Sequence, residues 1–212
     1  MDLMRSEFGR VFGRVLGRRL FVLSSITAAT RPLLAVGEGY KFPAVEDLKN
    51  KVTLDSVTIG VEAFSTAEQT AKVFGKVDPN KYEVLPVLLG IKNDRKTALR
   101  TAPLELQYIV PGLGKVEALR PDEVMYAGDA PSRPNLGPSP LPIPRRRKKN
   151  PLSAPEIEGK AYVAKMIAPG DSALGFVYFN VRHRTSAKFY LSGLADSASG
   201  QELFYYEIPF EN

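Results

Sequence analysis

Hydrophobic and polar residues alternate with a period of two over much of the chain, most densely near the C-terminus. Residues 174–181, 187–194 and 201–210 each alternate in the way that is typical of a β-strand. The polar stretches between them, 182–186 and 196–200, are rich in turn-forming residues. The pattern predicts a three-stranded antiparallel meander, which needs a second layer to cover its apolar face.

The middle of the chain predicts further strands and one helix. Residues 51–64 and 104–110 alternate, and a Pro-Gly turn after the second of these predicts a hairpin that returns over residues 115–119. Residues 82–93 are almost continuously apolar, which indicates a strand buried on both faces. A capping-box pattern and a C-terminal glycine favour a short helix over residues 66–74.

These elements predict an all-β fold, an antiparallel β-sandwich with one short helix and a long Pro-rich loop. We expect one domain over residues 38–212, preceded by a separate N-terminal segment, residues 1–37. Residues 127–155 hold eight of the seventeen prolines, so we expect an extended excursion there.

Two features of the chain resemble the small immunoglobulin-like domains of bacterial exported proteins and lipoproteins. One is the aliphatic strand that ends in a polar turn over residues 84–94, followed by a strand introduced by Pro103. The other is Pro-Gly, a short gap and Gly-Phe-Val-Tyr-Phe, over residues 169–179. The resemblance covers about residues 51–210. It implies an immunoglobulin-like sandwich with an adhesive or scaffolding role, and it carries over no catalytic residue.

Charge is unevenly distributed along the chain. Residues 1–36 carry +4 and residues 145–149 carry +5 of the net charge of +6, so the rest of the chain is at −3. The high isoelectric point therefore does not predict a basic binding face on the folded body.

The N-terminal segment resembles an export signal. Arg18 and Arg19 are followed by Phe21 and aliphatic residues, as in the twin-arginine motif, and a moderately apolar run covers residues 20–29. Small residues at 35–37 offer a cleavage site, which predicts a periplasmic or secreted protein. The alternative is an uncleaved basic amphipathic arm that lies on a membrane surface.

The basic run is formed by Arg145, Arg146, Arg147, Lys148 and Lys149. It predicts either a solvated loop or a contact with an anionic surface such as lipid. No aromatic residues are interleaved with it, so we do not expect a nucleic-acid partner.

The sequence predicts no catalytic residue, metal site or cofactor. The absence of Cys excludes disulfides and thiolate ligands. His183 is the only histidine, and its two Arg neighbours indicate a surface position. Residues 112–115 superficially match a phosphate loop and residues 196–202 a calcium loop, but both lack the full motif and are interpreted as turns. A hydrolase that uses Glu105 and Glu117 is a weaker alternative.

Three strand tyrosines form the candidate partner surface. Tyr178, Tyr190 and Tyr205 are each predicted to point away from their apolar neighbours. Exposed tyrosine is enriched at recognition sites, although cross-strand aromatic pairing explains the same pattern. The sequence therefore predicts a non-catalytic exported interaction or scaffold domain with a protein or envelope partner. The alternative is a peripheral membrane protein that uses its basic segments.

Overall fold

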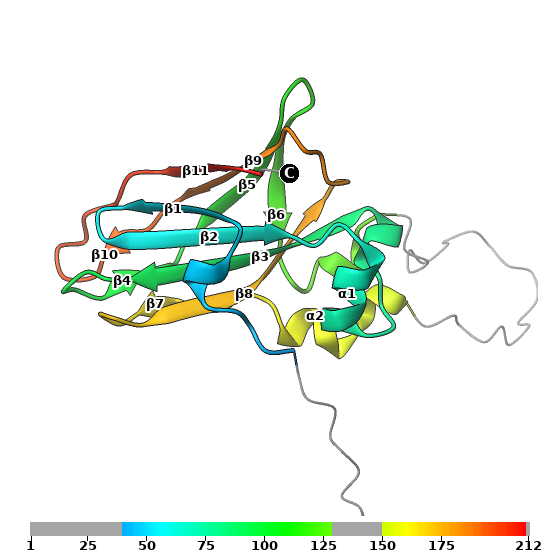
Figure 1. The fold of residues 1–212 in the computed structure, drawn as a ribbon, viewed down its shortest axis with the longest axis horizontal. Coiled ribbons are helices and arrows are strands. Elements are labelled where there is room, and N and C mark those ends of the chain that lie inside the picture. The colour runs from blue at the N-terminus through cyan, green and yellow to red at the C-terminus, as the bar shows by residue number, and fades with distance from the viewer. Residues whose placement is uncertain (1–39, 129–149, 211–212) are drawn as a thin grey trace, which may run out of the picture. The chain divides into compact units, whose positions relative to one another are not determined.

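The computed structural model describes residues 40–128 and 150–210 of the chain. The fold is all-β and antiparallel, as predicted, with an eight-stranded sheet and a small three-stranded sheet (Figure 1). In spatial order the large sheet contains β1 (Asn50–Leu54), β2 (Val57–Ala63), β3 (Val84–Asn93), β8 (Ser172–Asn180), β6 (Gly114–Leu119), β5 (Glu105–Val110), β9 (Lys188–Ser192) and β11 (Tyr206–Pro209). The small sheet contains β10 (Ala195–Asp196), β4 (Leu99–Arg100) and β7 (Met166–Ile167).

The large sheet curves until its two edge strands approach each other. The Tyr206 hydroxyl of β11 donates a hydrogen bond of 3.3 Å to the Leu54 carbonyl of β1. β6 joins the two halves of the sheet, because it pairs with β5 through residues 114–117 and with β8 through Ala118 and Leu119. The eight strands therefore form one continuous and nearly closed sheet, and two separate sheets are not evident in its pairing.

The concave side of the large sheet encloses the main core. Its members come from strands of both halves of the sheet, so the two inner faces pack on each other. Among its fully buried side chains are Ile59, Leu85, Leu89, Ile91, Tyr108, Phe179, Phe189 and Leu191.

A second core lies on the opposite side of β3 and β8. Here Leu88, Phe176 and Tyr178 pack against helical segments. The strand β3 is thus buried on both faces, as its apolar run predicts. Figure 1 shows the helices at one end of β3 and the small sheet at the other. The helical segments are α1 (Ala67–Phe74), α2 (Pro155–Gly159) and the 3-10 turns η1 (Val45–Asp47), η2 (Pro79–Tyr82), η3 (Val124–Tyr126) and η4 (Pro151–Ser153).

Local signals located α1 and the β5–β6 hairpin correctly. α1 begins one residue later than its predicted start, because the capping box is formed by Thr66 and Gln69. Gly75 ends the helix with a φ of 64°, a conformation that glycine adopts without strain. The second helix, α2, has only five residues and therefore carries little helical periodicity in the sequence.

The prediction of a single strand over residues 51–64 is wrong. Asp55 and Ser56 both have positive φ, at 50° and 59°, and they form a tight turn between β1 and β2. Two consecutive residues with positive φ give a hairpin turn whose twist matches the flanking strands. Period-two alternation continues across such a turn, so it did not reveal the reversal.

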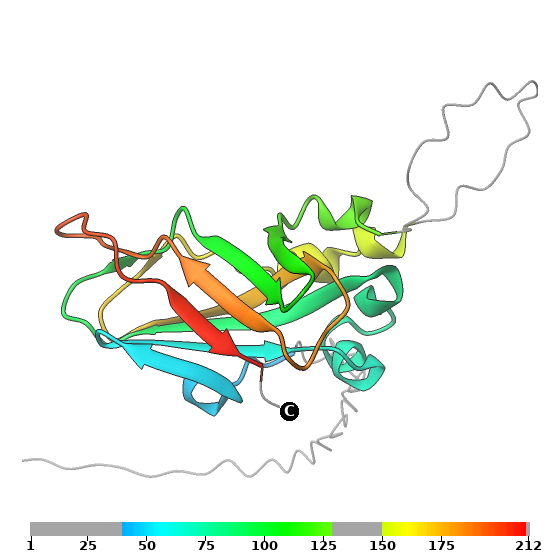
Figure 2. The same cartoon turned by 90° about the horizontal axis from the view of Figure 1, so that it is seen from above.

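The predicted C-terminal meander is also wrong. β9 and β11 are neighbours, but the β5–β6 hairpin lies between β8 and β9 (Figure 2). Residues 182–186 therefore cross from one half of the sheet to the other and do not close a hairpin. Only residues 206–209 of the predicted last strand pair with β9.

The Pro-rich excursion is shorter than predicted at both of its described ends. The amide of Asn150 donates to the carbonyl of Met125 at 2.6 Å, and Leu152 is buried in the second core. Residues 150–155 thus belong to the folded body. Residues 129–149, with the basic run 145–149, lie outside the described residues, as do Arg18 and Arg19.

Candidate functional site

Tyr178 does not belong to a partner surface. Its side chain is fully buried in the second core, and its hydroxyl donates a 2.7 Å hydrogen bond to the carbonyl of Ile157. Burial raises the pKa of the Tyr178 hydroxyl far above its ordinary range. The alternation of β8 was read correctly, but the face opposite the main core is covered by helical segments rather than by solvent.

The other two predicted tyrosines lie together on the outer face of the sheet. The rings of Tyr190 and Tyr205 stack with centroids 5.4 Å apart and an interplanar angle of 26°. The ammonium of Lys115 lies 5.8 Å from the Tyr190 ring centroid, within cation–π range. Tyr205 is 57% exposed and its neighbour Phe204 is 71% exposed. We call Tyr190, Phe204 and Tyr205 the aromatic surface.

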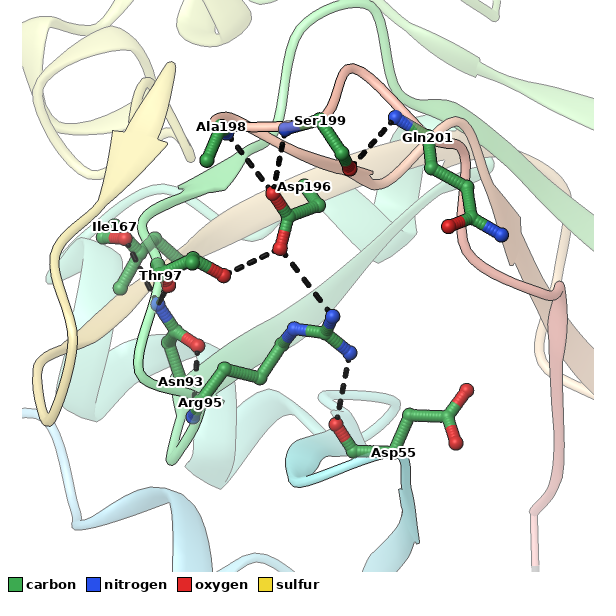
Figure 3. A network of polar contacts seen from close by, with 9 residues as sticks. All are labelled: Asp55, Asn93, Arg95, Thr97, Ile167, Asp196, Ala198, Ser199 and Gln201. Carbon is green, nitrogen blue, oxygen red and sulfur yellow. Dashed lines mark hydrogen bonds and ion pairs between the residues drawn. The ribbon is translucent and has the colours of Figure 1, made fainter.

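A buried carboxylate fixes the loop that leads into the aromatic surface (Figure 3). Asp196 accepts hydrogen bonds from the backbone N–H groups of Ala198 and Ser199, at 2.9 and 3.0 Å. Its second oxygen accepts from the Thr97 hydroxyl and lies 3.3 Å from the Arg95 guanidinium. These donors, led by Thr97, hold the pKa of Asp196 well below its usual range.

The same network ties three loops to one another. The amide of Asn93, which is fully buried, donates to the carbonyls of Thr97, Ile167 and Ala168 at 2.9–3.2 Å. Arg95 donates to the carbonyl of Asp55 at 3.2 Å, in the β1–β2 turn. We call Asn93, Arg95, Thr97 and Asp196 the polar network. Phe204 and Tyr205 thus follow a loop that is rigidly held, as a preorganised binding surface requires.

A cleft of about 670 Å³ lies beside the start of β5. One wall is the start of β5, residues 104–107, and the other is the segment 162–165 with residues 176–178 of β8. The strand β6 forms one end, where it leaves β5 and crosses to β8. At the other end Thr101 donates from its hydroxyl to the carbonyl of Ala164 at 2.7 Å. We call this the edge cleft.

A glycine sets the position of the far wall. Phe176 donates its N–H to the carbonyl of Lys160 at 2.8 Å, and Tyr162 donates to the carbonyl of Phe176 at 2.9 Å. A Cβ atom on the neighbouring Gly175 would lie 2.5 Å from the Cα of Tyr162. Only glycine allows the two backbones to approach so closely.

Two polar side-chain atoms in the edge cleft are buried without a partner. They are the Oε1 atom of Gln107 and the hydroxyl of Tyr162, and neither forms a hydrogen bond to any residue that the structure describes. Burial raises the pKa of Tyr162 to about 12, and a weak polar interaction with the Thr101 side chain lowers it by less. Gln107 lies directly opposite Tyr190 in the β5–β9 register, so one residue that lines the cleft neighbours one residue of the aromatic surface.

Both carboxylates of the hydrolase alternative line this cleft. Glu105 and Glu117 are exposed, and Glu117 lies opposite Gln107 in the β5–β6 register. Glu105 accepts a 3.3 Å hydrogen bond from the Ser192 hydroxyl. His183 does not line the cleft, so the one imidazole of the chain is not beside these carboxylates.

His183 is half-buried rather than on the surface, which corrects the prediction. Its Nδ1 atom lies 2.9 Å from the Tyr108 hydroxyl, and its ring packs edge-on against Phe210 with centroids 5.4 Å apart. The same hydroxyl accepts from the backbone N–H of Arg184 at 2.9 Å. Burial lowers the pKa of His183. His183 thus packs in the segment that connects β8 to β9, and no carboxylate is among its hydrogen-bond partners in the described residues.

The remaining sequence candidates are turns. Residues 112 and 114 have positive φ in the β5–β6 connection, which matches a hairpin and not a phosphate loop. The carboxylate of Asp196 is occupied by donors of the protein, which leaves residues 196–202 as a structural loop. Within residues 40–128 and 150–210, no three or more His, Asp or Glu side chains gather as a metal site would need.

Sequence reasoning missed Gln107 and Tyr162, because nothing in their local pattern marks a cleft. The only sequence signal for its wall was Gly175 inside an otherwise aromatic strand. Comparison with known proteins found no matching family model and no matching curated sequence. None of the described helices combines the length and the hydrophobicity needed to cross a membrane.

Proposed function

We propose that the chain is a non-catalytic interaction or scaffold domain that binds a protein partner through the aromatic surface. The observation that carries the proposal is the exposure of Phe204 and Tyr205 beside the half-buried Tyr190. Leaving a Phe side chain in solvent forgoes about 2 kcal/mol of burial free energy. Tyr and Phe are enriched at the centres of protein interfaces, where a partner recovers that free energy.

The rigid support of this surface favours recognition. The hydrogen bond from Leu203 N–H to the Leu194 carbonyl, at 2.7 Å, holds the residue that precedes Phe204. A surface that is already ordered loses little conformational entropy when it binds. An immunoglobulin-like sandwich is part of the proposal, and the packing of two antiparallel half-sheets on one core supports it.

Export to the bacterial cell envelope is the second part of the proposal, and it rests on the twin-arginine-like sequence at Arg18 and Arg19. N-terminal sequencing of the protein from its native cell tests it. A mature N-terminus near residue 38 supports export, and an intact N-terminus in the cytoplasmic fraction contradicts it.

Site-specific photocrosslinking tests the partner surface. A photoreactive residue is placed at position 205 in the full chain and, as a control, at Tyr126, which is 60% exposed in η3. We expect a discrete protein adduct from position 205 that is absent from position 126, and weaker adduct formation when Tyr190→Ala is added. Equal adducts at both positions, or none at position 205, contradict the proposal.

A further inference from the structure

The start of β5 offers an open strand edge to the edge cleft. Its pairing with β6 ends at Gln107, while its pairing with β9 on the other side continues to Glu105. On the cleft side, Glu105 and Leu106 therefore have no strand beside them among the described residues. In an antiparallel strand successive N–H groups point to opposite edges, so one of these two residues presents its backbone to the cleft. Such an edge is a template for an added strand.

The unpaired side-chain atoms of the cleft match a peptide group. Gln107 Oε1 is an acceptor that lacks a partner in residues 40–128 and 150–210, and the Tyr162 hydroxyl, which interacts only weakly with the Thr101 side chain, is a donor. A peptide unit offers one N–H and one C=O, which satisfy an acceptor and a donor together. Both atoms lie just beneath the cleft surface, so a rotation of either side chain would bring its polar atom to the ligand, and pairing it would relieve the cost of a buried polar atom without a partner.

The two sides of the open edge differ in chemistry. Leu106 lies opposite the core residue Leu191, whereas Glu105 lies opposite Ser192 on the outer face. A strand added beside β5 would place alternate residues on these same two faces. Its inward residues would meet Leu104, Leu106 and Val177, which line the cleft, and its outward residues would meet the carboxylates.

The charge on the outer face of the cleft determines which residues of an added strand fit there. Neither Glu105 nor Glu117 takes part in an ion pair with a residue that the structure describes. Arg120, at the same end of the cleft as Glu117, is already paired with Glu123 at 2.8 Å. One further cation, Lys165, lines the Thr101 end. The uncompensated charge of the lining is therefore negative, which favours a basic ligand.

From these four observations we infer that the edge cleft binds an extended segment of a partner protein in which basic and aliphatic residues alternate, added as a strand to β5. The inference deepens the proposed function and rests on its claim that the chain is a binding domain. The four residues of β5 and its approach that line the cleft, 104–107, span about 13 Å, so the core of the bound segment is about four residues long.

Calorimetric titration of the full chain with three peptides tests the inference. The probe is acetyl-Lys-Val-Lys-Val-Lys-Val-amide. One control, acetyl-Glu-Val-Glu-Val-Glu-Val-amide, has the same pattern with opposite charge. The second, acetyl-Lys-Lys-Lys-Val-Val-Val-amide, has the same composition without alternation. We expect the alternating Lys-Val peptide to bind at least tenfold more tightly than either control at low ionic strength.

A charge-reversed variant makes the test specific to the cleft. Glu105→Lys with Glu117→Lys changes two exposed side chains and is expected to fold normally. The variant should lose about tenfold in affinity for the Lys-Val peptide and prefer the Glu-Val peptide. Glu68→Lys with Glu158→Lys changes the net charge equally at two other exposed sites and should keep the wild-type preference.

Each contrary result overturns a defined part of the account. Absence of Lys-Val binding, equal binding of the block peptide, or an affinity unchanged by the charge reversal overturns the assignment to the cleft. Self-association that the charge-reversed variant abolishes would make a second copy of the chain the occupant and also overturns it. If the peptide fails while position 205 still crosslinks to a protein, the inference falls and the proposed function stands. If the peptide binds while position 205 gives no protein adduct, the inference about the cleft stands and the assignment of the aromatic surface as the partner site falls.

Discussion

The polar network and the edge cleft both place polar groups inside a largely apolar protein, but they differ in how many of those groups have partners. In the network, Asp196 accepts from four donors and Asn93 donates to three carbonyls. Three buried side-chain atoms of the described residues lack a partner, and two of them, on Gln107 and Tyr162, lie in the cleft. The third is the Nε atom of Arg95, whose two terminal nitrogens are both engaged.

The comparison separates polar groups that stabilise the fold from polar groups that do not. A satisfied buried network is costly to break, because each lost partner leaves another polar atom unpaired. A buried polar atom without a partner does not stabilise the fold, and its removal relieves the free-energy cost of burying it. Substitutions in the two regions should therefore change stability in opposite directions, which makes the comparison testable.

The largest effect is expected from Asn93→Asp in the polar network. One oxygen of the new carboxylate would keep the backbone N–H of Arg95 as a donor, at 3.1 Å, but the other would face the carbonyl oxygens of Thr97, Ile167 and Ala168 with no donor between them. We expect the free energy of unfolding in urea to fall by about 3–5 kcal/mol, the cost of an uncompensated buried charge. Asn80→Asp is the matched control, because Asn80 donates to a single carbonyl, that of Phe64. Equal losses at the two positions would contradict a special role for the network.

The pH dependence of Asp196→Asn is expected to come next. The folded-state pKa of Asp196 lies well below its ordinary value of 3.8, chiefly because Thr97 and Ser199 donate to the carboxylate. A lowered pKa stabilises the fold above about pH 4, and this stabilisation is lost as the pH falls towards the folded-state pKa. Acid unfolding curves should show this loss in the wild type and a smaller one in the variant. Parallel curves for the two proteins would contradict the assignment.

Two tyrosine-to-phenylalanine substitutions should change stability with opposite signs. Tyr178→Phe removes the hydrogen bond to the Ile157 carbonyl and should lower the free energy of unfolding by about 1–2 kcal/mol. Tyr162→Phe removes an unpaired buried hydroxyl and should raise it by up to about 1 kcal/mol. Chemical unfolding of both variants measures the difference, and the same sign for both would remove the basis of the comparison.

The smallest effect is expected at the aromatic surface. A double-mutant cycle with Tyr190→Ala and Tyr205→Ala should give a coupling of about 0.5–1.5 kcal/mol from the stacked rings. Each single substitution should cost little stability, because the pair lies on the outer face. Loss of several kcal/mol from either one would show that the pair holds the fold together, and it would weaken the case for a partner surface.

The fold was predictable from sequence where it depends on local pattern. The apolar run of β3, the capped helix α1 and the Pro-Gly turn of the β5–β6 hairpin each carry their signal within a few residues. Strand order was not predictable, because the insertion of β5 and β6 between β8 and β9 depends on contacts between residues far apart in the chain.

The candidate site shows the same limit. Alternation correctly placed Tyr190 on an outer face, yet it also placed Tyr178 there, since a strand pattern does not reveal a second covering layer. It also placed Phe204 on the face of Tyr206, but β11 begins only at Tyr206, and both Phe204 and Tyr205 are exposed. Glu105 and Glu117 were paired from sequence and do line one cleft. The cleft itself arises because β6 leaves β5 for β8, which no local pattern records.

Amide hydrogen exchange at the start of β5 tests the central claim most directly. The exchange rates of the Glu105 and Leu106 N–H groups are measured by NMR in the full chain, with and without saturating alternating Lys-Val peptide. We predict that one of these two amides, the one directed to the cleft, becomes protected at least tenfold, because it donates to the added strand. Unchanged exchange at both residues in the saturated complex would contradict strand addition at this edge.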